Sequence, residues 1–141
     1  MVVKVTAYWE GGYRCRIPVR GHELLVDEPP EYGGADTGPM PTELFLSSLA
    51  ACFTMAVYHA ARKRGIELSD LATSVTGDYE GLCFSKIHVE VHSNSPREVL
   101  EPLLERAVDY CYVSNTLLRT PALEYAITDE PVTQEPAPGR A

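Results

Sequence analysis

Positive charge is scarce in this chain. It has 12 lysine and arginine residues against 20 aspartate and glutamate residues, and its formal net charge is -8 at pH 7. Because an acidic chain repels the phosphates of DNA and RNA, we expect no nucleic-acid partner. The one basic cluster, residues 62–64, falls at the end of a predicted helix, where cations offset the helix dipole.

Long uninterrupted apolar runs are also missing. The first nine residues alternate as a β-strand does and lack the continuous apolar segment of a secretory signal. The most apolar stretch, residues 44–61, is broken by polar residues such as Ser48 and His59, which suits a buried helix better than a membrane span. We therefore expect a cytoplasmic protein without a membrane partner. Its four cysteines should then be mostly reduced, so that a disulfide would be catalytic rather than structural.

Motifs for metals and nucleotides are absent as well. The sequence has no C-x-x-C pair, no P-loop, no dinucleotide fingerprint and no nucleophile elbow. His88 and His92 share the exposed face of a predicted strand, and that face offers no neighbouring ligands for zinc. We expect neither a metal nor a bound cofactor.

The apolar pattern predicts an α+β fold. With 141 residues, of which 45% are hydrophobic, the chain suits one domain over residues 1–130 with a flexible proline-rich tail at 131–141. Strands are predicted at residues 2–9, 13–19, 24–26, 72–80, 83–92 and 123–127, and helices at residues 41–64, 96–110 and from 114 onward. The helix at 41–64 is apolar on nearly every side, so it must be buried in this chain or against a partner subunit. This order predicts an antiparallel sheet packed on a long buried helix.

Local details refine these elements. In the first strand, Val3, Val5 and Trp9 share one apolar face. Ser95 and Ser114 stand where their hydroxyls would cap the two later helices.

Two cysteines stand out as candidates for thiol chemistry. Cys52 lies inside the predicted buried helix, where a cysteine taken alone is most simply a small core residue. Cys111 lies at a helix end, and a helix beginning near Ser114 would stabilise a thiolate there. Spacing alone does not bring the two together. His59 shares the helix face of Cys52 two turns later, which fits a packed core histidine better than a site residue.

Two segments, each carrying one of these cysteines, resemble the OsmC/Ohr family of thiol peroxidases. The first reads GGADTGPMPTEL at residues 33–44 and continues with SLAAC at 48–52. The second runs over residues 107–117 and includes CYVSNTL. The likeness extends over nearly the whole chain, from WEGG at residues 9–12 to the last predicted strand.

This resemblance implies a redox role for both thiols. In the family, the cysteine on the central helix attacks a hydroperoxide and the second cysteine resolves the sulfenic acid as a disulfide. These roles fall to Cys52 and Cys111 here. The resemblance also implies an intertwined homodimer, an organic hydroperoxide as substrate, and an external dithiol or lipoylated protein as reductant in place of a bound cofactor.

A positive side chain should accompany the reactive thiol, because burial opposes its ionisation. Family members use an arginine near the N-terminal hairpin, held by a glutamate just before the central helix. By this likeness Arg14 is the candidate arginine, with Arg16 and Arg20 as alternatives because the strand register is not fixed by sequence. Glu43 is the candidate glutamate.

The chain departs from the Ohr pattern at two places. Thr42 stands directly after the proline where Ohr proteins have the glutamate, and Glu43 follows one residue later. Tyr112 takes the place of the proline that usually follows the resolving cysteine. Both departures indicate the OsmC-like branch rather than Ohr itself.

A second hypothesis is a non-catalytic dimeric binding protein for an apolar small ligand. Phe45, Leu49 and Phe53 of the predicted central helix would line an apolar pocket. In the peroxidase hypothesis the same pocket would favour organic hydroperoxides over hydrogen peroxide. The shifted glutamate keeps the binding hypothesis open.

Overall fold

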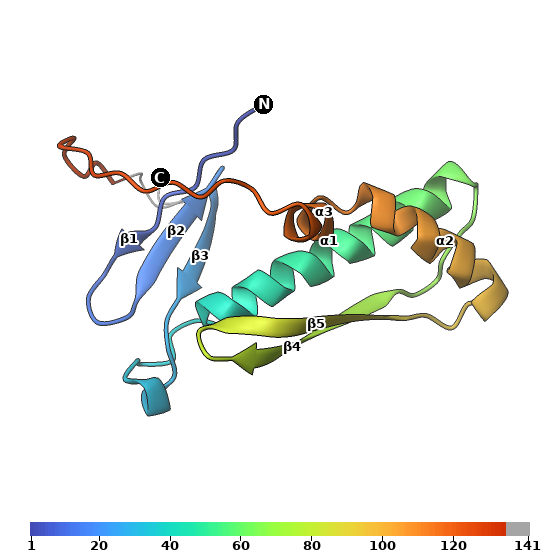
Figure 1. Ribbon diagram of the computed structural model, residues 1–141, viewed down its shortest axis with the longest axis horizontal. Helices are drawn as coiled ribbons and strands as arrows, with labels where there is room; N and C mark the ends of the chain where they lie inside the picture. The colour runs from blue at the N-terminus through green and yellow to red at the C-terminus, as the bar shows by residue number, and fades with distance from the viewer. Residues whose placement is uncertain (135–141) are drawn as a thin grey trace. The chain divides into compact units, whose positions relative to one another are not determined.

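The fold is that of a computed structural model, in which residues 1–134 are described (Figure 1). The elements are β1 (Tyr8–Trp9), β2 (Cys15–Val19), β3 (His22–Val26), the 3-10 helix η1 (Pro30–Tyr32), α1 (Pro41–Lys63), β4 (Ala72–Glu80), β5 (Cys83–His92), α2 (Arg97–Tyr110) and α3 (Tyr112–Leu118). They form two compact units: a terminal unit of Met1–Leu44 with the residues from Glu124 onward, and a central unit of Phe45–Leu123. The predicted α+β fold with antiparallel strands and a helix packed on them is confirmed, but the described strands form two sheets, β1–β3 and β4–β5, in place of the one predicted. The single domain over residues 1–130 stays a prediction, and residues 135–141 of the predicted tail lie outside the described residues.

The terminal unit is built on an antiparallel meander of β1, β2 and β3. Its first strand is much shorter than predicted, and its apolar face is reversed: Tyr8 is 7% exposed and Trp9 is 73% exposed. Tyr8 is buried because its ring lies 5.2 Å from the Arg16 guanidinium and its hydroxyl donates to the carbonyl oxygen of Thr133 at 2.9 Å. These contacts satisfy the polar tip of a residue that a simple alternation places outside.

A second prediction fails where the chain passes from the central unit back to the terminal unit. The apolar alternation of Leu123, Tyr125 and Ile127 predicts a strand, but no strand forms there among the described residues, and the three side chains are 76%, 88% and 98% exposed. A strand is held by hydrogen bonds to a neighbouring strand, and alternation alone supplies none.

The loop between β3 and α1 is organised by one buried carboxylate. Asp27 accepts hydrogen bonds from the hydroxyl of Thr37 at 2.7 Å and from the backbone N–H groups of Glu28, Ala35 and Thr37 at 2.8, 3.3 and 3.1 Å. These bonds, with that of the Thr37 hydroxyl the largest, lower the pKa of Asp27 to about 2. The carboxylate therefore holds the glycine-rich loop in the form that leads into α1.

Replacing Asp27 with asparagine should destabilise the protein in a pH-dependent way. The folded-state pKa of about 2 lies below the usual 3.8, so the carboxylate stabilises the fold above that usual value and loses this contribution as the pH falls towards 2. The amide also presents a donor to N–H groups that need an acceptor. We expect urea denaturation to show the largest difference between wild type and Asp27→Asn near neutral pH and a shrinking difference from pH 4 to pH 2. A difference that does not vary with pH would contradict this role.

The central unit places α1 along the β4–β5 hairpin, with α2 and α3 beside it (Figure 1). The hairpin forms over the predicted residues, with Val75 opposite Val89. The core contains the apolar residues Leu49, Phe53, Ala56, Val57, Ala60, Ala61, Leu103 and Ala107 together with Cys111. Among the described residues, α1 is the one helix long and apolar enough to cross a membrane, and a core helix passes the same test. One face of α1 packs in this core, whereas Met55 and Tyr58 on another face are 68% and 58% exposed, so burial of the whole helix stays a prediction.

Both predicted serine caps are wrong. Helix α2 begins at Arg97 after Pro96, without a side-chain cap, and the Ser95 backbone N–H donates to the hydroxyl of Ser93 at 3.1 Å. Helix α3 begins at Tyr112, two residues before Ser114, so Cys111 is its N-cap. Both helices therefore begin without a side-chain cap from their N-cap residues, Pro96 and Cys111.

Candidate functional site

The two candidate thiols occupy different environments of the central unit. Cys52 lies in the middle of α1, at the edge of its buried face, and is half-buried. Cys111 is 0% exposed and joins two helices, as the C-cap of α2 and the N-cap of α3. Its backbone N–H donates to the carbonyl oxygen of Ala107, and its carbonyl oxygen accepts from the N–H of Asn115, both at 3.0 Å. Both cysteines are free thiols.

The structure brings these two thiols together. The Cys52 thiol interacts with the Cys111 side chain and with the backbone N–H groups of Tyr112 and Val113. Those N–H groups belong to the first turn of α3, where no carbonyl oxygen of the same helix is available to accept them. The fold therefore places a helix start and a second sulfur against the thiol of α1.

The same contacts shift the acidity of Cys52. Burial raises the pKa of its thiol most, the N–H of Val113 lowers it, the neighbouring Cys111 raises it and the N–H of Tyr112 lowers it, with a net rise. Two N–H groups thus offset part of the cost of burying a thiolate. The contacts that set this pKa include no cation from the described residues, so a positive charge would be needed to favour the thiolate at neutral pH.

Arg14 and Arg16 share one acidic partner in the terminal unit. The Arg14 Nε atom lies 3.2 Å from Oε1 of Glu10, and the Arg16 Nε atom lies 3.8 Å from Oε2 of the same residue. Arg16 is 9% exposed and also lies 3.6 Å from a carboxylate oxygen of Glu23. Glu10, which the sequence does not single out, is therefore the acid that holds both arginines.

Arg20 and Glu43 have local roles. Arg20 adopts a left-handed conformation, with φ at 49°, in the turn between β2 and β3. The Glu43 carboxylate accepts the backbone N–H of Met40 at 2.9 Å, at the start of α1. All four candidate charged residues belong to the terminal unit and both thiols to the central unit, so a pairing of Arg14 with Glu43 at Cys52 stays a prediction.

Cys52 opens into a pocket of about 560 Å³, which we call the thiol pocket. Its lining residues come from α1, the end of α2 and the start of α3, and they are Cys52, Met55, Ala56, His59, Asp109, Tyr110, Tyr112 and Asn115. The interpretation of His59 as a core histidine is wrong, because this side chain is exposed. Its ring packs edge-on against Tyr110, with centroids 4.9 Å apart. The spacing of seven residues from Cys52 is the one signal that links His59 to the thiol.

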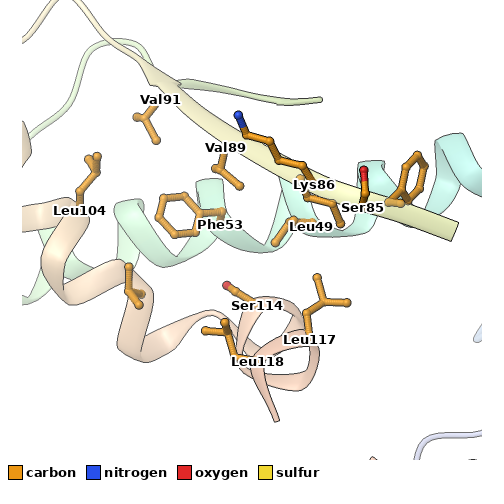
Figure 2. Close-up of a pocket in the computed structure, with 13 residues that line it drawn as sticks. Leu49, Phe53, Ser85, Lys86, Val89, Val91, Leu104, Ser114, Leu117 and Leu118 are labelled. Carbon is orange, nitrogen blue, oxygen red and sulfur yellow. The ribbon is translucent and has the colours of Figure 1, made fainter. Parts of the chain in front are cut away.

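A second hollow, the apolar cleft, lies between α1, β5, α2 and α3 and has a volume of about 710 Å³. Figure 2 shows Leu49 and Phe53 on one side of it and Leu117 and Leu118 on the other. Cys52 is not among its lining residues. The Ser114 hydroxyl oxygen is buried here without a hydrogen-bond partner among the described residues. Leu49 and Phe53 thus line an apolar pocket as predicted, whereas Phe45 stacks on Phe84 at 6.1 Å.

The described residues lack a set of side chains that could bind a metal ion. Within residues 1–134, no group of three or more histidine, cysteine, aspartate or glutamate side chains could hold a metal ion. The ring of His92 instead lies 3.2 Å from the hydroxyl of Ser74 on the neighbouring strand.

Comparison with known proteins agrees with this fold. Residues 33–126 match the family model of OsmC-like proteins. The chain is similar to an OsmC like protein from Mycoplasma pneumoniae, with 21% identity over 85% of this chain and 89% of that chain and a TM-score of 0.70. It is also similar to an organic hydroperoxide resistance protein OsmC from Legionella pneumophila, with 24% identity over 83% and 90% of the two chains and a TM-score of 0.63.

A third similar structure is an organic hydroperoxide resistance protein from Elizabethkingia anophelis, with 23% identity over 82% of this chain and 89% of that chain and a TM-score of 0.58. A comparison with curated proteins gives no significant match. At these identities the solved structures show a shared fold, and the family model covers more than half of the chain, including both thiols that meet in the central unit. The chain therefore belongs to the OsmC-like family.

Proposed function

We propose that this protein reduces organic hydroperoxides with the thiols of Cys52 and Cys111. The observation that carries the proposal is the contact between the two side chains, beside two N–H groups of α3. Family membership supports it, since some proteins with this fold are named organic hydroperoxide resistance proteins. Cys52 is the attacking thiol because it lines an open pocket, whereas Cys111 is fully buried.

The chemistry proceeds in two balanced steps. The Cys52 thiolate attacks the outer oxygen of the hydroperoxide, the O–O bond breaks, and a sulfenic acid and an alkoxide form, the latter taking a proton to become an alcohol. The Cys111 thiol then attacks the sulfenic sulfur, and a disulfide forms with loss of one water molecule. A dithiol, either free or on a lipoylated protein, returns both cysteines to the thiol state and is itself oxidised to a disulfide.

Three features complete the proposal. An arginine, Arg14 in the first instance, supplies the positive charge that the Cys52 thiolate needs. The working form is a homodimer, in keeping with the exposed apolar side chains of both units, such as Tyr125 and Tyr58. The compartment is the cytoplasm, where the reductant keeps the resting thiols reduced.

Oxidation with a single equivalent of peroxide tests the proposal. The fully reduced protein is mixed with one equivalent of cumene hydroperoxide, and its disulfides are mapped by mass spectrometry. We expect a rapid and stoichiometric link between Cys52 and Cys111, because their side chains already interact. Cys15 and Cys83 serve as internal controls that should stay reduced. Thiols that remain unreacted for minutes would overturn the proposal.

The apolar cleft favours a second function, which is binding of an apolar ligand without chemistry. Its volume of about 710 Å³ lies within the range of small-molecule sites, and Ser114 offers one hydroxyl to a ligand's polar atom. Native mass spectrometry of the purified protein decides between the two: a retained apolar ligand together with no peroxide consumption favours binding, and peroxide consumption favours catalysis.

A further inference from the structure

One face of α1 carries the reactive thiol and two basic side chains. His59 and Lys63 follow Cys52 by seven and eleven residues, which places both within about 20° of it around the helix axis. Along the axis they lie about 10 Å and about 16 Å from it. The thiol and these side chains therefore point from the same strip of helix surface.

A histidine lines the thiol pocket and a lysine lies beside it, at the end away from Cys52. His59 lines this pocket, and Lys63 places its Nζ atom 5.3 Å from the ring centroid of Tyr110, another lining residue. Asp109 also lines the pocket, and its carboxylate lies 3.5 Å from a guanidinium nitrogen of Arg106. The acidic lining residue Asp109 is thus paired with a cation, and His59 in the pocket and Lys63 beside it are the groups that can attract an anion.

His59 is held in place and is still available to a ligand. Its ring packs edge-on against Tyr110, and within residues 1–134 its nitrogens make no hydrogen bond. A role as the base that deprotonates Cys52 is excluded by distance, because a general base must lie about 2.6–3.2 Å from the atom that gives up its proton. Two helical turns separate the two side chains, so that a molecule in the pocket would contact both.

We propose that His59 is a specificity-determining residue that binds a carboxylate on the hydroperoxide while the O–O bond lies at Cys52. The inference rests on the proposed function and narrows its substrate to hydroperoxides with an acidic group at the far end. The apolar middle of the pocket, at Met55 and Ala56, suits a short hydrocarbon or aromatic spacer between the two groups. Lys63, whose ammonium lies over the Tyr110 ring, adds electrostatic attraction for the carboxylate.

A pair of peroxides that differ in one charge tests this assignment. Cumene hydroperoxide and its para-carboxylate react at similar O–O bonds, and only the second carries an anion. The rate constant for oxidation of reduced Cys52 is measured for both, without any reductant present. We expect wild-type protein to prefer the carboxylate by roughly 10-fold, the usual value of one charge-assisted hydrogen bond, and His59→Leu to lose that preference.

Matched variants separate this effect from general disturbance. His88→Gln changes an exposed histidine on β5, outside the thiol pocket, and should keep the wild-type preference. His59→Gln retains a hydrogen-bond donor and should keep part of it. An unchanged preference in His59→Leu, in protein with a wild-type circular dichroism spectrum and melting temperature, would overturn the inference.

A binding measurement keeps this inference distinct from the proposed function. The probe is 4-isopropylbenzoate, which has the carboxylate and ring but no O–O bond, and its affinity for reduced protein is measured by calorimetry. We expect His59→Leu to weaken binding by roughly 10-fold. If neither peroxide oxidises Cys52, the proposed function fails, and the calorimetry still decides whether His59 binds the carboxylate. Equal affinity in wild type and His59→Leu would refute that contact.

Discussion

Replacing Cys52 with serine should lower the rate of hydroperoxide reduction by roughly 1,000-fold or more, as expected when a catalytic nucleophile is lost. The sulfur of Cys52 is the atom that accepts oxygen, and a serine hydroxyl at the same place does not form the corresponding sulfenic acid. The substitution changes one atom in a half-buried side chain, so the fold should be retained. Consumption of cumene hydroperoxide with dithiothreitol as reductant measures the loss.

The partner variant, Cys111→Ser, should stop the reaction one step later. Peroxide then converts Cys52 to a sulfenic acid that finds no second thiol, and dimedone traps it as an adduct at Cys52 in the mass spectrum. Cys83→Ser is the matched control, because Cys83 is exposed at the end of the β4–β5 hairpin and should not enter the reaction. Turnover at the wild-type rate in Cys52→Ser would contradict the assignment of the attacking thiol.

Elements whose stabilising contacts are nearby in sequence could be predicted well. The β4–β5 hairpin has the predicted residues because its two strands alternate and pair with each other across a short turn. Helix α1 likewise ends one residue from its predicted end, before Gly65, which adopts a left-handed conformation with φ at 66°. The apolar alternation at residues 123–127 predicts a strand that does not form among the described residues. A strand also needs a neighbouring strand to accept and donate its hydrogen bonds, and the alternation does not identify one.

The sequence predicts which residues carry the chemistry of the site, but not how those residues are arranged in space. Resemblance marked Cys52 and Cys111, but their contact depends on how α1 packs against the first turn of α3, which lies far along the chain. His59 was misread because helical spacing gives a shared face and does not reveal that α2 and α3 leave a pocket there. Glu10 was missed because its two arginine partners converge only once β1 and β2 are paired.

Replacing Arg14 with methionine should slow oxidation of Cys52 at pH 7 by about 10- to 1,000-fold, if this arginine supplies the charge that favours the thiolate. An opposite charge near an ionisable group lowers its pKa by about 1–3 units, and only the thiolate reacts. Burial is the largest of the influences on the pKa of the Cys52 thiol, and it raises that pKa. Without the arginine, the thiolate fraction at neutral pH therefore falls.

The pH profile gives this prediction its direction. A thiol whose pKa is raised reacts about tenfold faster for each pH unit until the pKa is reached, so alkaline buffer should restore Arg14→Met towards the wild-type rate. A variant that is slow for structural reasons would not recover. Arg20→Met is the control, since Arg20 lies in a turn, and Arg16→Met tests the alternative arginine. Both guanidiniums lie beside Glu10, so replacing either arginine also changes the ion pair of the other. A slow rate at pH 7 that recovers at high pH in Arg16→Met, but not in Arg14→Met, would move the role from Arg14 to Arg16.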